Sequence, residues 1–260
     1  MVDTIIAPRY YIDIGVGRDS FWPWTGPLEA LGMACDSIPS ASEDLAIGNA
    51  QEVWQRFLAR YRDLWLVRSS SFAPLAPVGE WVDLRCMSKV VQPSNIQRAL
   101  ESLGGDLYIA EVRGQEVRLV RKVAFAPEAM QSFAMRCAER AMRFCSDNRI
   151  VSALNTARAY AEGHADINEV RWAATMAERV SEEVVGQDRV TAVLADMVAE
   201  LCHSMHGNAA VHAMRVASAG VDVLLEYYEY EGADADCAVV REYTLQNADL
   251  VALLGLLGPE

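Results

Sequence analysis

Three of the four histidines lie close together, in the stretch "LCHSMHGNAAVHAM". His203 and His206 are three residues apart and share one face of a helix, to which His212 would return from the next helix. Imidazole nitrogens joined by a carboxylate such as Glu200 or Asp196 suit zinc or iron. The sequence therefore leaves open a metalloenzyme that uses this cluster.

Two features of the same stretch favour a structural role. The HExxH spacing of metalloproteases is absent, and Gly207 ends the helix between His206 and His212. Histidine is also favoured at the negative C-terminal end of a helix, which accounts for His164 just after Gly163. We therefore predict no bound metal and no cofactor.

A second stretch, "LLEYYEYEGADAD", interleaves tyrosines with acidic residues. Tyrosine offers rigid apolar area with a polar tip, and acidic neighbours pair with Arg or Lys of a partner. A solvated helix end is the alternative interpretation. The residues that we predict to bind a protein partner are Glu226, Tyr227, Tyr228, Glu229, Tyr230 and Glu231.

Other catalytic patterns are weak. "YIDIGVG", residues 11–17, resembles the first motif of class I methyltransferases, but its third glycine is replaced and the punctuated "FWPWTGP" follows. We expect a strand and a glycine turn there instead. The chain has no P-loop, nucleophile elbow or Ser-His-Asp constellation. The sequence leans away from an enzyme and assigns no catalytic residue.

Composition bounds the class of protein. The chain has 260 residues, of which 52% are hydrophobic, which is ample for a packed core. No run reaches the roughly 18 apolar residues of a membrane span, and the N-terminal residues lack signal-peptide character. The six cysteines are scattered without a CxxC pair, which predicts reduced thiols, although an even count also permits disulfides. We expect a soluble cytoplasmic protein that does not bind membranes.

Charge is unevenly divided along the chain. The net charge is −13, and residues 131–260 carry 10 basic and 20 acidic side chains against 13 and 16 in residues 1–130. An acidic half disfavours nucleic acid, whose binding depends on neutralising phosphates. It suits a basic protein partner.

The first half predicts a small α+β domain with an antiparallel sheet, residues 1–125. Ser40 and Glu43 form a capping box at the start of one helix, and Gly104 ends another. The stretch "FWPWTGP" is too punctuated for a regular element. The expected elements are strands over 9–16, 64–72 and 80–88, helices over 40–63 and 93–105, and a hairpin over 106–125 that turns at "RGQE".

The second half, residues 126–260, predicts a mostly antiparallel helical bundle. Its apolar residues recur at helical spacing, and Cys137 and Cys145 lie on the first stripe as small hydrophobes, whereas Arg140 faces elsewhere. Gly163, Gly186, Gly207 and Gly232 lie near the breaks between helices. The helices are expected near 127–146, 149–163, 166–185, 187–206, 208–231 and 236–256. The predicted fold class is therefore α+β.

Part of this helical half resembles a known family, in the stretch "CAERAMRFCSDNRIVSALNTARAYAEGHADINEVRWAATMA", residues 137–177. The stretch resembles the helical domain of Imm-5-like immunity proteins of bacterial toxin loci, over roughly residues 130–220. The matching positions are Cys137, Ala138, Glu139, Arg149, Ala153, Ala157, Arg158, Tyr160, Ala161 and Gly163. The resemblance implies a helical, partner-binding protein without catalytic residues.

The leading hypothesis is non-catalytic protein binding, most simply immunity-type neutralisation of a toxin by occlusion. The first alternative is an accessory subunit that recruits a peptide-modifying enzyme through strands 106–124. The second is the metalloenzyme based on the histidine cluster.

Overall fold

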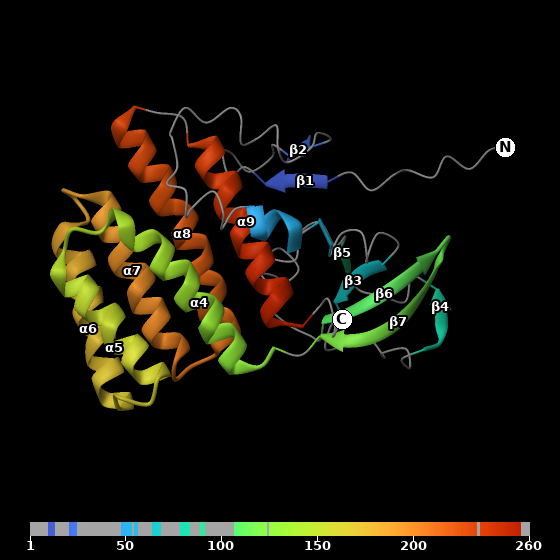
Figure 1. Ribbon diagram of the computed structural model, residues 1–260, viewed down its shortest axis with the longest axis horizontal. Helices are drawn as coiled ribbons and strands as arrows, with labels where there is room; N and C mark the ends of the chain where they lie inside the picture. Colours follow the sequence, from blue (N-terminus) through green and yellow to red (C-terminus); the bar gives the residue numbers. More distant parts are fainter. Residues whose placement is uncertain are drawn as a thin grey trace. The chain divides into compact units, whose positions relative to one another are not determined.

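The chain forms an α+β structure, which confirms the predicted fold class (Figure 1). The computed structural model describes residues 10–13, 21–24, 48–53, 55–56, 64–68, 79–83, 89–91, 107–123, 125–232 and 235–255. Two compact units divide the chain, one of residues 1–124 with 250–260 and one of residues 125–249. The predicted division into two domains, at residue 125, stays a prediction about independent folding.

Two antiparallel sheets lie in the first unit. β1 (Tyr10–Asp13) pairs with β2 (Phe21–Trp24). The larger sheet has the strand order β4-β7-β6-β3-β5. Its strands are β3 (Leu64–Arg68), β4 (Trp81–Asp83), β5 (Lys89–Val91), β6 (Leu107–Arg113) and β7 (Glu116–Val123).

The prediction that residues 21–27 hold no regular element is wrong for Phe21–Trp24, which form β2. Pro23 lies opposite Tyr11 in a sheet of two strands. Proline is tolerated in such an edge strand because its missing N–H can face away from the ladder. Composition alone therefore did not predict the strand in this stretch.

The predicted hairpin is confirmed, and Gly114 explains its turn. Gly114 has a φ of 63°, a left-handed conformation that glycine adopts without strain. One face of the hairpin forms a small core, and on the other Arg118 pairs with Glu111 and stacks on the Trp81 ring, 5.0 Å from its centroid. The core residues are Tyr108, Ala110, Val117 and Leu119, with Val82 packed on them.

Parts of the remaining predictions lie outside the described residues. Residues 48–53 and 55–56 are helical, within the helix expected over 40–63. The capping box of that helix, the helix expected over 93–105 and the glycine turn after β1 lie outside the described residues.

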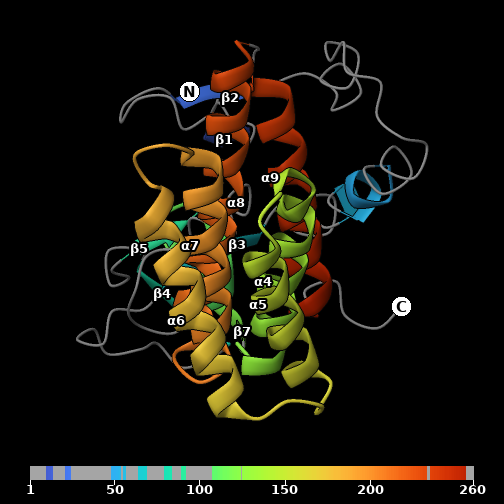
Figure 2. The ribbon, with the colours of Figure 1, turned by 90° about the vertical axis from the view of Figure 1, so that its left-hand side faces the viewer.

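The second unit is a bundle of antiparallel helices (Figure 2). A short 3-10 turn, η3 (Met142–Phe144), ends its first helix, and α9 runs on into the first unit. The observed bounds agree with the six predicted helices to within a few residues. They are α4 (Pro127–Ala141), α5 (Asn148–Ala161), α6 (Ile167–Val184), α7 (Arg189–Ser204), α8 (Ala209–Glu231) and α9 (Asp236–Leu253).

Local sequence signals set these bounds. Asp147, Asp188 and Asn208 cap α5, α7 and α8 through their side chains, and Asp166 forms a full capping box at α6. Gly232 ends α8 with a φ of 66°. None of the helices among the described residues is long and apolar enough to cross a bilayer.

Candidate functional site

Three segments lie together at one end of the bundle: the break between α4 and α5, the turn between α6 and α7, and the C-terminus of α8. The ring of Phe144, in η3, lies 4.5 Å from that of Tyr227, measured between centroids. Arg189, at the start of α7, pairs with Glu226 at an N–O distance of 3.3 Å. We call this region, with residues 185–189 and 226–232, the acidic end.

The structure divides the six predicted partner-binding residues into two groups. Tyr227 packs on Phe144, Tyr228 packs against the core cluster of Val221 and Leu224, and the two tyrosine rings meet edge to face with centroids 5.5 Å apart. Their rings therefore serve the packing of α8. They do not form an open face.

The other group points outward. Tyr230 is 85% exposed, the largest exposure among the large hydrophobic side chains of the described residues, and Glu229 and Glu231 beside it are exposed too. Within the described part of the chain, none of these three side chains makes a hydrogen bond or ion pair. Glu226, by contrast, is largely covered and bonded to Arg189.

A further carboxylate, Asp222, lies one turn before Glu226 on the same helix. Burial raises the pKa of Asp222, and the Glu226 carboxylate one turn away raises it further. Val185, 61% exposed, adds apolar area beside the start of α7. An acidic surface with exposed apolar groups suits a partner that brings Arg or Lys.

The three clustered histidines lie at the other end of the bundle, where α7 ends and α8 begins. The His203 ring lies 5.5 Å from that of His206 and 5.6 Å from that of His212, between centroids. His203 Nε2 lies 2.9 Å from a Glu178 oxygen, and His212 Nδ1 lies 2.6 Å from one of Glu200. The rings come together as the spacing predicts, but His203 and His212 contact different carboxylates.

This geometry does not form a metal cage. Among the residues with a described position, no group of three or more His, Cys, Asp or Glu is arranged so that it could hold a metal ion. Burial lowers the pKa of His206, and the neighbouring His203, Arg171 and His212 lower it further. A neutral imidazole is thereby favoured at this end of the bundle.

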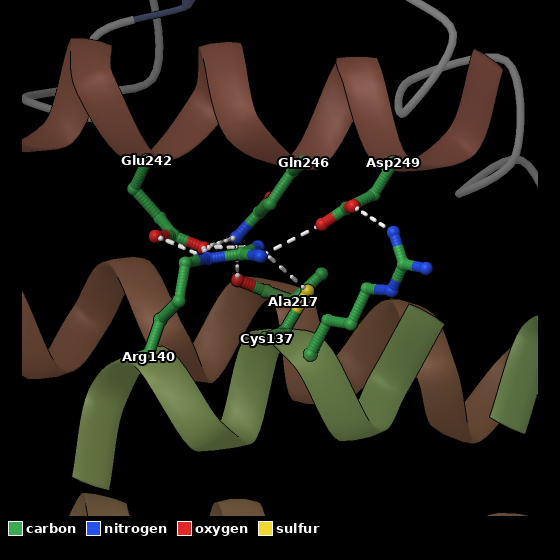
Figure 3. Close-up of polar contacts among 7 residues, drawn as sticks. Cys137, Arg140, Ala217, Glu242, Gln246 and Asp249 are labelled. Atoms are coloured by element: carbon green, nitrogen blue, oxygen red, sulfur yellow. Dashed lines mark hydrogen bonds and ion pairs between the residues drawn. The ribbon is translucent and has the colours of Figure 1, made fainter. Parts of the chain in front are cut away.

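A buried ion network joins α4 to α9 (Figure 3). The Arg140 guanidinium donates to both Glu242 oxygens at 2.9–3.1 Å and to Asp249 at 2.7 Å, and Arg136 also donates to Asp249. Gln246, fully buried, donates to Glu242 and to the Ala217 carbonyl of α8. The network is most deeply buried at Gln246 and Glu242, and Arg136 at its edge is about half exposed. It links α4, α8 and α9.

The prediction that Arg140 faces away from the packed side of α4 is therefore wrong. Its charge is acceptable inside because two carboxylates surround it. A signal was present in the sequence, since Glu242, Gln246 and Asp249 are spaced four and three residues apart and share one face of α9.

The free thiols of the bundle are not activated. Burial raises the pKa of Cys202 to about 12, and burial also raises the pKa of Cys137 and of Cys145. Reactive cysteines need the thiolate, so these three act as small apolar groups. Cys137, Cys145 and Cys202 are free as predicted, whereas Cys237 is disulfide-bonded, which corrects the prediction of reduced thiols at that position.

One exposed residue was missed by sequence reasoning. Trp172 of α6 is 62% exposed, and the guanidinium of Arg179 lies 6.0 Å from its ring centroid. Its position in the helix was informative, because Trp172 lies off the apolar stripe formed by Val170, Ala173 and Ala177.

Comparisons with known proteins assign no relative to this chain. No protein-family model matches it, no curated protein matches it, and no solved structure matches it. The resemblance to Imm-5-like immunity proteins stays a prediction.

Proposed function

We propose that this chain is a non-catalytic protein-binding protein whose acidic end holds a basic surface of its partner. The observation that carries the proposal is Tyr230, which is 85% exposed between two exposed glutamates. A large aromatic side chain held at a helix end loses little conformational entropy when a partner covers it. Glu229 and Glu231 supply charges for flanking Arg or Lys.

The other titratable groups of the bundle support a binding role by contrast. Arg140 is engaged with Glu242 and Asp249, and the free cysteines are protonated by burial. Such groups are used in holding the bundle together. The outward carboxylates of the acidic end, by contrast, are exposed and available to a partner.

The partner that we propose is a toxin, neutralised when the acidic end covers its basic functional surface. Support comes from the resemblance of residues 137–177 to immunity proteins and from the net charge of the second half. The predicted cytoplasmic location and the accessory-subunit alternative stay predictions.

Affinity capture from native lysate tests the proposal when it compares variants. We expect Tyr230→Ala and Glu229→Lys each to reduce the stoichiometric partner by about tenfold, as for a central anchor and its flanking charge. Glu162→Lys is the matched control, because Glu162 is an exposed acid at the other end of α5. Equal capture by all variants would show that the partner uses a different surface.

A further inference from the structure

The surface of α6 around Trp172 has a character opposite to that of the acidic end. Trp172 is 62% exposed, Arg179 stacks on its ring, and Arg171 is exposed on the neighbouring side. We call Arg171, Trp172 and Arg179 the basic-aromatic patch.

The arginines of the patch are not paired with the acids of α6, of which Glu182 and Glu183 lie three and four residues from Arg179. Neither Arg171 nor Arg179 forms an ion pair within the described ranges. Three of the acidic residues of α6 are engaged elsewhere, Glu169 with the backbone of Asp166, Glu178 with His203 and Glu183 with Arg149. A fourth, Glu182, is exposed and pairs with neither arginine.

The chemistry of the patch selects its ligand. Two guanidinium groups about two helical turns apart suit carboxylates spaced along a short peptide, and the Trp172 ring offers apolar contact between them. Charges further away are screened over about 8 Å at physiological salt, so a short acidic peptide responds chiefly to the two arginines and to Glu182 beside Arg179. A nucleic acid is longer and would also carry its phosphates past other acidic side chains of residues 131–260, which hold 20 acidic and 10 basic residues.

We propose that the basic-aromatic patch of α6 is a second protein-binding surface, which takes an acidic segment carrying an apolar or aromatic side chain from a partner. This surface lies on the part of α6 that contacts the end of α7, whereas the acidic end contains the start of α7. The chain would then bind two partners of opposite charge.

Fluorescence anisotropy with labelled peptides tests this second surface on the full chain. We expect the peptide EEFEEFEE to bind, and its counterparts QQFQQFQQ and KKFKKFKK to bind at least about tenfold more weakly. Arg179→Glu, Arg171→Glu and Trp172→Ala should each weaken the acidic peptide about tenfold, and Trp172→Phe should weaken it less. Arg189→Glu is the matched control, since Arg189 is an exposed arginine of the acidic end.

Three results would overturn the proposal. The first is equal binding of EEFEEFEE to the wild type and to Trp172→Ala, provided that both unfold at the same temperature. The second is tighter binding of a labelled single-stranded oligonucleotide than of the acidic peptide, which would assign the patch to nucleic acid. The third is concentration-dependent sedimentation of the chain alone that Trp172→Ala abolishes, which would assign the patch to a second copy.

Discussion

Charged side chains in the interior of the bundle and those at its acidic end are arranged in opposite ways. Inside, Arg140 is enclosed by Glu242 and Asp249, and the fully buried Gln246 completes the network. At the acidic end, Glu229 and Glu231 stand exposed on both sides of Tyr230, without a hydrogen bond or ion pair from any described residue.

This difference separates groups that stabilise the fold from groups that are available to a partner. A buried charge without its counter-ion costs several kcal/mol, so the loss of one member of the interior network should destabilise the fold. An exposed carboxylate costs little in water and keeps its interaction energy for another molecule. Substitutions in the two regions should therefore affect different measurements.

The largest effect is expected for Arg140→Met, which leaves the largely buried Glu242 without its cation. We expect the free energy of unfolding to fall by about 3 kcal/mol, the lower part of the range for a broken buried pair, because Arg136 still serves Asp249. Chemical denaturation measures this change. Arg158→Met is the control, since the pair of Arg158 with Glu139 is exposed, and it should cost under about 1 kcal/mol.

Two neighbouring tyrosines give the next largest contrast. Tyr228→Ala should lower the free energy of unfolding by about 2–3 kcal/mol, because Tyr228 packs on the core cluster with Leu224. Tyr230→Ala should change it by less than about 0.5 kcal/mol, because that ring faces water. Partner capture should show the reverse order at temperatures where both variants are folded. A similar loss of stability in both variants would remove the distinction.

Two glycines in turns between helices differ in how closely they are packed, and substitutions there should differ in their effect on stability. A Cβ on Gly207 would lie 3.0 Å from the His203 carbonyl oxygen and from Nε2 of His212, whereas one on Gly186 would meet nothing within 4 Å. We expect Gly207→Ala to destabilise by about 1–3 kcal/mol, as overpacking does, and Gly186→Ala to be neutral or stabilising by up to about 1 kcal/mol. Thermal unfolding of both variants measures these changes. Equal changes in stability would show that the turn at Gly207 rearranges to accommodate the Cβ without cost.

The smallest effect concerns pH. The pKa of His206 is lowered in the folded chain, so the unfolded chain binds the proton more readily near the ordinary value of 6.5. The contribution of His206 to stability is therefore complete above pH 6.5 and is lost as the pH falls through 6.5 toward the folded pKa. His206→Asn should flatten the loss of unfolding free energy between pH 7.5 and about pH 5. Parallel curves for both proteins would show that His206 does not contribute.

The helices of the bundle could be predicted because their signals are local. Asp166 and Glu169 form the capping box that begins α6, and Gly232 ends α8 in a left-handed conformation. β2 could not be predicted in the same way. Its support comes from pairing with β1, a contact that outweighs the poor strand propensity of Pro23.

The functional surfaces were harder to predict than the helices. The acidic and aromatic composition of residues 226–231 located the acidic end, but only tertiary packing separates the packed Tyr227 and Tyr228 from the exposed Tyr230. Arg140 was misplaced because an isolated arginine on one helix says nothing about the carboxylates of another helix about 100 residues away. Trp172 was detectable as an aromatic residue off the apolar stripe.

Site-specific photo-crosslinking in native cells would test the central claim most directly. A benzoylphenylalanine in place of Tyr230 should give one discrete adduct with a protein that carries a basic surface, because Tyr230 is the exposed centre of the acidic end. The same photoreactive residue in place of Glu162, which is exposed at the other end of α5, should not give that adduct. No adduct from position 230, or the same adduct from both positions, would contradict a binding role for the acidic end.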